Sequence, residues 1–429
     1  MIFPPQHPKI CVMYVALLFT VLTLGAQPDL VDLPRPDPSV VGVEAATQAY
    51  LDTVSPEKRA RSDAYFEGGY WLILWRFLWS SLAMLALLHF GLSARMRDAA
   101  ARVTGRVFLQ PAIYWAAFTL CVAVMTLPLS IYADFLREQQ YGLSTQTFGA
   151  WFADALKVLG IELVLGAVGI VVFYAALRRA GRRWWLWGTG VAMTIMIFTA
   201  MIGPVYLAPI FNTYQPVQDA AIREPVLSVA RANGIAAGEV WEMDASRQTT
   251  RISANVSGML GTERITLNDN LLRRTSRGGV LAVMGHEIGH YVLNHVYELL
   301  LWFGVLIAIA FGAIAWAFPV LAARNAGRWR IRGIDDPAGL PLIVLLFGAY
   351  FFLITPITNS IIRSNEYEAD VFGLNAAREP EGFAEASLLL GEYRKLHPGR
   401  IEEMLFFDHP SGYTRIQAAM RWKAENPRP

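Results

Sequence analysis

Cysteine is nearly absent from this chain of 429 residues: Cys11 and Cys121 are the only two, and both lie within apolar runs. Two isolated cysteines exclude a disulfide framework and a zinc site built from thiolates. An excess of one charge is also missing, because 37 Lys and Arg face 35 Asp and Glu. This balance gives no basic surface for a nucleic-acid partner. Any metal must therefore be held by His, Asp or Glu side chains.

Hydrophobic residues, in contrast, are abundant: they make up 54% of the chain, and the mean hydropathy is +0.35. This is more apolar than an average soluble protein. Crossing a bilayer takes a helix of about 20 apolar residues. Seven runs approach that length, at residues 10–26, 70–92, 111–133, 159–177, 184–207, 299–322 and 340–362. The sequence thus predicts an α-helical integral membrane protein with seven transmembrane helices, whose constant partner is the lipid bilayer.

Two features bear on how the chain enters the membrane. The first run resembles a signal peptide, with Lys9 before it, but Leu24 is a poor residue beside a cleavage site, so we favour a retained anchor. Arginine is concentrated in the loops after the second, fourth and sixth runs: Arg95, Arg97, Arg102, Arg106, Arg178, Arg179, Arg182, Arg183, Arg324, Arg328, Arg330 and Arg332. The positive-inside rule places these loops in the cytoplasm and the opposite end outside it.

Two polar stretches, from about residue 212 to 298 and from 363 to 429, flank the last two runs and emerge on the same side. The first predicts a helix at 220–232, a strand at 240–243 and a strand pair at 251–257 and 263–267. The second predicts helices at 366–377, 382–396 and 411–425. We expect one small α+β lobe. The predicted division is 1–210 (transmembrane helices one to five), 211–298 (lobe), 299–362 (helices six and seven) and 363–429 (lobe).

The first polar stretch contains the pattern H-E-x-x-H, formed by His286, Glu287 and His290. On a helix the two histidines lie at i and i+4, so both imidazoles project from one face. This spacing suits two nitrogen ligands of one zinc ion, and Glu287 is placed to take a proton from water at the metal. The alternative is an ordinary buried amphipathic helix.

A third ligand is expected from a later helix. A histidine six residues beyond His290 would suit, but that position is Val296. Glu366 and Asp370 share a helix face, which allows Glu366 to bind zinc and Asp370 to accept the free N–H of a ligand histidine. Glu368 points away from that face. The alternative is a solvated acidic helix end.

Three further polar residues are candidates. His409 and Arg415 could stabilise an oxyanion or hold substrate, whereas a proline turn with Ser411 as the cap of the last helix explains the same letters. His295 could be a ligand, but five residues beyond His290 it points off the zinc-facing side of a continuous helix. We therefore favour a structural or lining role for His295.

One strand before the metal-binding helix has a composition that suits substrate binding. Ser253, Ala254, Asn255 and Val256 mix small and polar residues, as expected of an edge strand that adds a peptide backbone to a sheet. A simple hairpin arm is equally compatible with these residues.

These motifs together resemble the CAAX prenyl protease type I family, seven-span membrane zinc metallopeptidases related to the yeast a-factor-processing enzyme. The matching segments are 141–148, 207–212, 258–272, 286–295, 366–370, 409–411 and Arg415. The resemblance runs from about residue 130 to the end and implies one zinc ion on His286, His290 and Glu366, with Glu287 as general base. It also implies that Asp370 and Asn294 lie behind the metal, that His409 and Arg415 lie near the substrate, and that the helices enclose a water-filled chamber.

We therefore predict a zinc endopeptidase acting on membrane-associated or lipidated peptides or proteins. The Arg, Ala and Trp content points to a bacterial inner membrane, and hence to membrane-protein quality control rather than prenyl-protein processing. The edge strand, where relatives with prenylated substrates have asparagine-alanine-aromatic, also differs. The resemblance places the catalytic side in the cytosol, whereas the arginines place it outside. No oligomer is implied. The alternatives are an intramembrane site-2-type protease and an inactive transporter-like or chaperone-like protein.

Overall fold

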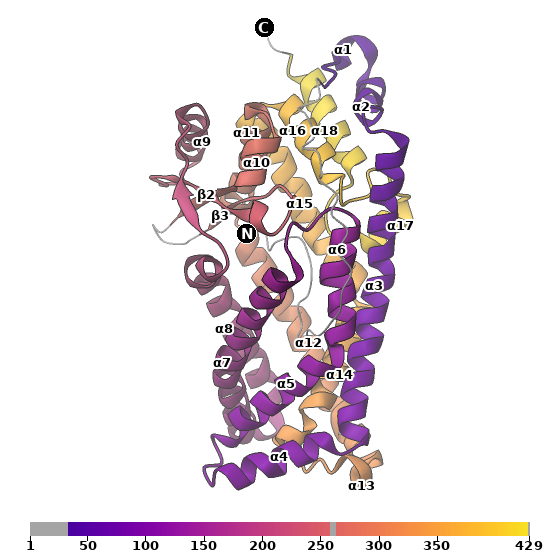
Figure 1. The fold of residues 1–429 in the computed structure, drawn as a ribbon, viewed down its shortest axis with the longest axis vertical. Helices are drawn as coiled ribbons and strands as arrows, with labels where there is room; N and C mark the ends of the chain where they lie inside the picture. The colour runs from indigo at the N-terminus through magenta and orange to yellow at the C-terminus, as the bar shows by residue number, and fades with distance from the viewer. Residues whose placement is uncertain (1–32, 258–262, 428–429) are drawn as a thin grey trace.

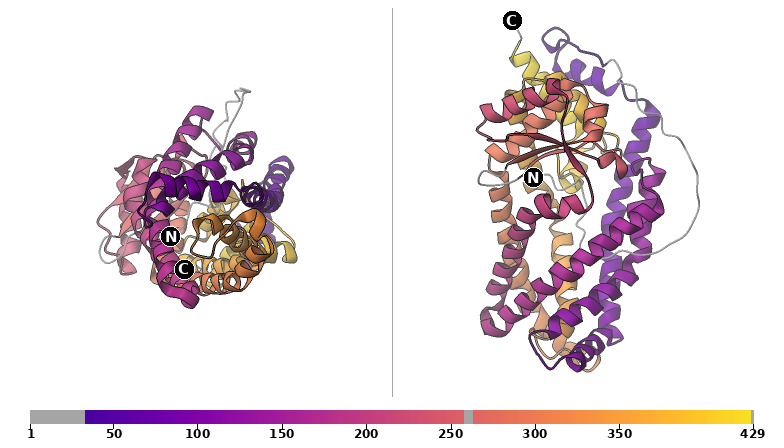
Figure 2. Two further views of the ribbon diagram at one scale, coloured as in Figure 1. Left: turned by 90° about the horizontal axis from the view of Figure 1, so that it is seen from below. Right: turned by 60° about the vertical axis from the view of Figure 1, so that its left-hand side comes forward.

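Long helices form the lower part of the molecule, and a lobe of helices and one sheet lies at the other end (Figures 1 and 2). The computed structural model describes residues 33–257 and 263–427. The long helices are α3 (Pro56–His89), α5 (Gln110–Ile131), α7 (Phe148–Ala180), α8 (Trp184–Ile202), α12 (His295–Arg324), α14 (Leu340–Leu353) and α15 (Thr355–Ala377). Short helical segments complete this part: α4 (Leu92–Val103), η1 (Tyr132–Leu136), α6 (Arg137–Gln140), η2 (Gly181–Arg183), η3 (Gly203–Leu207), η4 (Ala208–Ile210), α13 (Ala326–Trp329) and η6 (Pro337–Gly339).

Four helical stretches among the described residues are long and apolar enough to cross a membrane, or five if the pair α14 and α15 is one broken span. The stretch Phe148–Ile210 contains α7 and α8, which pack against each other. It therefore holds both the fourth and the fifth predicted runs. The first predicted run lies outside the described residues, so the count of seven stays a prediction.

The seventh predicted run is not one straight helix. It breaks after Leu353, and α15 leaves α14 at an angle of 59°. Pro356 lies in the first turn of α15, where the missing N–H of proline costs no helical hydrogen bond. The bend directs α15 into the lobe. Glu366 and Asp370 therefore lie in the lobe, on the helix that follows α14.

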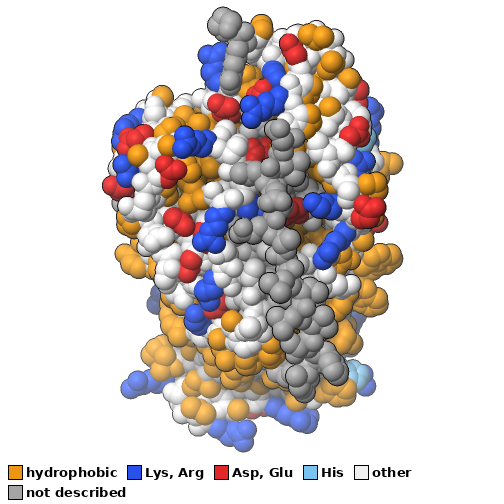
Figure 3. Space-filling view, turned by 45° about the horizontal axis from the view of Figure 1, so that its top comes forward, with side chains coloured by type: hydrophobic (Ala, Val, Ile, Leu, Met, Phe, Trp, Pro, Cys, Tyr) orange, Lys and Arg blue, Asp and Glu red, His pale blue; other side chains and the backbone are white. Residues whose placement is uncertain are grey.

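Apolar side chains hold the lower bundle together and also cover its outside. Its core gathers buried residues of α3, α5, α7, α12 and α14, among them Tyr114, Phe118 and Phe318. In the most apolar window of each candidate span only 22–50% of residues are buried. Figure 3 shows a belt of hydrophobic side chains below the lobe, with Lys and Arg at the far end. This distribution fits helices whose outer faces contact lipid.

The lobe contains a four-stranded sheet of β1 (Tyr214–Pro216), β2 (Val240–Met243), β3 (Ala254–Ser257) and β4 (Arg264–Asn268), in the order β1-β2-β4-β3. The predicted strand pair is confirmed: β3 and β4 run antiparallel, with Val256 opposite Ile265. The parallel pairing of β2 with β4 and the short strand β1 were not predicted. The predicted turn of the hairpin lies outside the described residues.

The helices of the lobe are α9 (Ala220–Ala232), α10 (Asp269–Arg274), α11 (Arg277–Val292), α16 (Pro380–Leu390), α17 (Arg400–Phe406) and α18 (Gly412–Glu425), with η5 (Ala245–Arg247). The predicted helix at 382–396 ends early, because the chain turns at Gly391, where a Cβ would lie 2.4 Å from Leu396. Helix α17 was not predicted. After α1 (Pro38–Val41), helix α2 (Val43–Leu51) packs against α18. This part of the stretch 1–210 therefore belongs to the lobe in space, which the predicted division did not foresee.

Candidate metal centre

The site is built where α11 and α15 pack closely together. Helix α11 begins at the N-cap Ser276, whose hydroxyl accepts a hydrogen bond from the Gly279 N–H. Glycines allow the close approach: a Cβ on Gly373 would lie 2.7 Å from the backbone nitrogen of His286, and one on Gly285 would lie 2.9 Å from the Gly373 carbonyl oxygen. No side chain fits at those distances, so these glycines bring the histidines of α11 next to the acids of α15.

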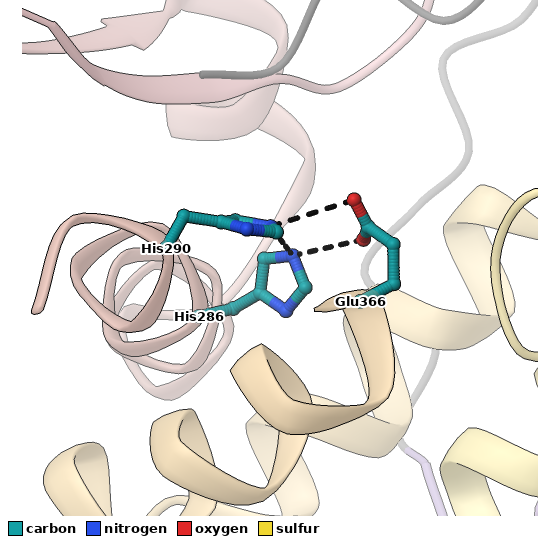
Figure 4. Close-up of side chains that lie close together, drawn as sticks. All are labelled: His286, His290 and Glu366. Atoms are coloured by element: carbon teal, nitrogen blue, oxygen red, sulfur yellow. Dashed lines mark hydrogen bonds and ion pairs between the residues drawn. The ribbon is translucent and has the colours of Figure 1, made fainter. Parts of the chain in front are cut away.

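His286, His290 and Glu366 point toward one another (Figure 4), and their ligand atoms all lie within 4.8 Å. The Nε2 atoms of the two histidines are 3.1 Å apart, and they lie 3.3 and 3.4 Å from the two Glu366 carboxylate oxygens. Ligands about 2.05 Å from a tetrahedral zinc ion are separated by about 3.3 Å. All three side chains are buried. The group therefore fits one small metal ion.

Glu287 lies beside this group without a partner. Its side chain is 1% exposed, and neither carboxylate oxygen has a hydrogen-bond partner among the described residues. Burial raises the pKa of Glu287 to about 7, against a lesser lowering by the neighbouring His286. A carboxyl group with a pKa near neutrality can both accept and donate a proton at physiological pH.

His286 has a fully buried ionic partner on its far side. Its Nδ1 is 2.8 Å from the Asp370 carboxylate, as the sequence predicted for Asp370. Arg415 donates hydrogen bonds from Nε (2.9 Å) and from a terminal nitrogen to the same carboxylate. Burial disfavours a charged imidazole, but hydrogen bonds to Asp370 and then Glu366 raise the pKa of His286 to about 9. Arg415, which was expected near the substrate, thus has its main contacts behind the metal group, although it also lines the adjacent cavity.

His290 has a different partner, which sequence reasoning missed. Its Nδ1 lies 2.9 Å from Nδ1 of His295, a residue 1% exposed. Helix α11 ends at Val292 and Asn294 adopts a left-handed conformation (φ 60°), so α12 begins at His295 in a new direction. His290 and His295 therefore do not lie on one continuous helix, and the expectation that His295 points away from the metal-binding face does not hold. The Asn294 side chain is exposed and donates a hydrogen bond to the Val292 carbonyl, so its predicted place behind the metal is corrected to a role in the turn.

His409 reaches the same group from the loop before α18. Its Nε2 is 3.1 Å from Glu366 and its Nδ1 is 2.8 Å from Asp408. Burial opposes ionisation of Asp408, but the charge of His409 and its hydrogen bond hold the pKa of Asp408 down at about 2. A carboxylate at Nδ1 leaves the Nε2 side of His409 facing the metal group. Ser411 caps α18, so the capping role considered from sequence is confirmed.

A cavity adjoins the metal group and reaches the edge strand. Its lining includes His286, Glu287, Glu366 and His409, together with Ser253 and Ala254. Of the four strand residues proposed from sequence, these two lie at the cavity. Asn255 and Val256 do not line it, and Val256 packs into the core of the lobe. Among the described strands β3 pairs only with β4, so its other edge is free.

A helical membrane region combined with a buried His-His-Glu group beside a buried glutamate defines a membrane metalloprotease. The chain matches two family models in succession: CAAX prenyl protease N-terminal, five membrane helices, over residues 43–213, and Peptidase family M48 over residues 216–423. The chain belongs to peptidase family M48 and carries the membrane region of the CAAX prenyl proteases.

Similar proteins agree with this assignment. The chain is 28% identical over 314 residues to the metalloprotease YhfN of Bacillus subtilis, covering 73% of this chain and 74% of that protein. It is 25% identical over 264 residues to CAAX prenyl protease 1 of Saccharomyces cerevisiae, covering 58% of each. The crystal structure of S. mikatae Ste24p has the same fold, with a TM-score of 0.71 at 18% identity over 89% of this chain and 96% of that one.

Proposed function

We propose that the protein is a zinc endopeptidase that cleaves membrane-associated or lipidated peptides. The observation that carries this proposal is that the buried ligand atoms of His286, His290 and Glu366 lie together, and that the partnerless carboxylate of Glu287 follows His286 directly on α11. A protein that merely kept the fold would have no need of a buried glutamate without a partner, because that group costs stability. Its presence favours an active enzyme over a transporter or an inactive relative.

His286, His290 and Glu366 would hold the zinc ion. Two nitrogens and one carboxylate are the donor set of several catalytic zinc sites, and three protein ligands leave a fourth position open. When bound, zinc supplies Lewis acidity, which lowers the pKa of water and polarises the scissile carbonyl. An intramembrane site-2-type protease would instead carry H-E-x-x-H inside a span; here α11 is not among the candidate spans.

Glu287 would act as the proton carrier. It accepts a proton from the attacking water as the oxygen bonds to the carbonyl carbon, and it delivers that proton to the amine nitrogen as the carbon–nitrogen bond breaks. Burial supports both steps, because it raises the pKa of Glu287 to about 7.

His409 and the edge strand would position the substrate. In its imidazolium form, with Asp408 at Nδ1, His409 can donate from Nε2 to the oxyanion that develops on the carbonyl oxygen. The free edge of β3 can pair with an extended peptide, and Ser253 and Ala254 would lie along it. Arg415 would act mainly through Asp370 and the cavity wall.

The surroundings of the site support a proposal for the substrate and for the side of the membrane that the lobe faces. The lobe adjoins the helical bundle, so segments at or in the bilayer are its nearest substrates; a bacterial inner membrane and quality control of membrane proteins suit this reading. Helix α4, with Arg95, Arg97 and Arg102, and α13, with Arg328, lie at the end opposite the lobe (Figure 1), and by the positive-inside rule this supports a lobe outside the cytoplasm. A periplasm-only reporter fused after Pro429 should be active; activity of a cytoplasm-only reporter there would reverse the orientation.

The test compares wild type with Glu287→Gln, purified in detergent. Zinc content and cleavage of a farnesylated fluorogenic peptide are measured beside the unmodified peptide. We expect about one zinc ion per chain in both proteins and cleavage only by the wild type. Cleavage by Glu287→Gln at the wild-type rate would refute its role, and zinc-free wild type would refute the ligand assignment. Equal cleavage of both peptides would remove the preference for lipidated substrates.

A further inference from the structure

The two metal-binding histidines are held from behind by different chemical groups. Asp370, a buried carboxylate, lies against Nδ1 of His286, whereas a second imidazole, that of His295, lies against Nδ1 of His290. His295 is 1% exposed, and its other nitrogen, Nε2, is 3.4 Å from a carboxylate oxygen of Glu368. The side chain of Glu368 is 60% exposed. The chain of contacts thus runs from the metal group outward to the surface.

Hydrogen-bond chemistry allows one arrangement of protons along this chain. A histidine that binds a metal through Nε2 carries its remaining proton on Nδ1. The Nδ1–H of His290 must then donate to Nδ1 of His295, which accepts only when His295 carries its own proton on Nε2. That Nε2–H points to Glu368. Glu368 therefore fixes the tautomer of His295, and His295 fixes the tautomer of His290.

We propose that His295 is a positioning residue for the metal centre: it fixes the tautomer and ring orientation of His290. This inference rests on the proposed metal-binding function. An imidazole suits this place because it accepts a hydrogen bond without adding charge. The negative charge of Asp370 behind His286 is balanced by Arg415. A second carboxylate behind His290 would have no such partner among the described side chains.

The backbone supplies the geometry of this contact. If α11 continued, residue 295 would project to another face than His290. The left-handed conformation of Asn294 ends that course, and α12 starts at His295. His290 and His295 therefore face each other with ring centroids 5.0 Å apart and rings inclined at 73°. Positioning depends on an acceptor at the place of Nδ1 and not on bulk alone.

The experiment compares His295→Asn with His295→Leu, two side chains of similar size. The carboxamide oxygen of Asn can take the place of the Nδ1 acceptor, whereas Leu has none. Zinc affinity is measured by competition with a chromophoric chelator in purified wild type and variants. We expect affinity to fall about 10- to 100-fold in His295→Leu and by less than about threefold in His295→Asn. Thermal unfolding in excess chelator reports whether the metal-free fold is intact.

The outcomes separate this inference from the proposed function. If His295→Leu binds zinc as tightly as wild type, His295 does not position His290, while the metal centre itself stands. If Asn and Leu weaken binding equally and also lower the unfolding temperature of the metal-free protein equally, His295 is only a packing residue. If wild type binds no zinc, the proposed function fails and this inference fails with it.

Discussion

The two sides of the metal centre differ in how they are built. Behind His286 lie Asp370 and Arg415, an ion pair of two buried side chains from α15 and α18. Behind His290 lie His295 and then the exposed Glu368, at the turn between α11 and α12. The first side is a charged contact between helices far apart in the sequence. The second is a neutral contact created by a local turn. Substitutions on the two sides should therefore change stability and zinc affinity by different amounts.

The same contrast appears in the protonation of the histidines. The Asp370 hydrogen bond overcomes burial and raises the pKa of His286 to about 9, whereas burial lowers the pKa of His290 to about 4. In the metal-free protein near neutral pH, His286 carries a proton that must leave before a metal binds. His290 is already neutral. The charge of Asp370 thus favours the protonated form of His286, whereas burial keeps His290 in the neutral form that can bind a metal.

The largest expected effect is on the His286 side. Asp370→Ala leaves the Arg415 guanidinium buried without its counter-charge and removes the acceptor at His286. We expect a loss of about 3–5 kcal/mol in the free energy of unfolding, together with weaker zinc binding. Chemical denaturation in detergent measures the first effect and chelator competition the second.

A double variant sharpens this prediction. Asp370→Leu with Arg415→Met removes both charges, so most of the stability should return while zinc affinity stays low. A double variant as unstable as Asp370→Ala would mean that packing, not the uncompensated charge, dominates this side.

The next largest effect concerns Glu287, whose carboxylate has no hydrogen-bond partner among the described residues on the His286 side or on the His290 side. Its folded-state pKa of about 7 lies above its usual value of 4.5, so its ionisation costs stability. The cost is absent below pH 4.5, grows up to pH 7 and stays constant above it, reaching about 3 kcal/mol. Metal-free Glu287→Gln should therefore be more stable than wild type at pH 8 and equal to it near pH 4. Equal thermal unfolding at both pH values would contradict this origin of the pKa shift.

A smaller effect is expected at the turn on the His290 side. The left-handed conformation of Asn294 costs alanine about 1 kcal/mol more than it costs glycine. Asn294→Ala should lower stability by at most that amount, because asparagine itself bears part of this cost, and should loosen the contact between His290 and His295. Asn294→Gly is the matched control and should leave zinc affinity near the wild-type value. If both variants lost zinc affinity equally, the Asn294 side chain, and not its backbone conformation, would contribute directly to zinc binding.

The smallest effect is expected from Glu368→Gln. The contact of Glu368 with His295 is long, at 3.4 Å, and water screens its exposed carboxylate. Zinc affinity should change by less than about threefold, or about 0.6 kcal/mol. If Glu368→Gln lowered zinc affinity as much as His295→Leu, the exposed Glu368 would also be needed to position His290.

Local patterns in the sequence located much of the site. The spacing of His286 and His290 placed both on one helix face, and the spacing of Glu366 and Asp370 did the same for α15; the structure brings the first three together and puts Asp370 behind His286. Helix α9 and strand β2 have their predicted bounds. These features depend on the 3.6- and 2-residue periods, which short segments display by themselves.

Contacts between distant segments and turns had to come from the tertiary structure. The main contact of Arg415 is with Asp370, because α18 packs behind α15, and no spacing in the sequence reveals that packing. His295 faces His290 because one residue, Asn294, leaves the helical conformation. The sequence by itself therefore identified the candidate metal-binding residues and the membrane character, since both follow from local composition and spacing. Only the tertiary structure decided what holds each ligand from behind, because a backbone turn and helix packing set those distances.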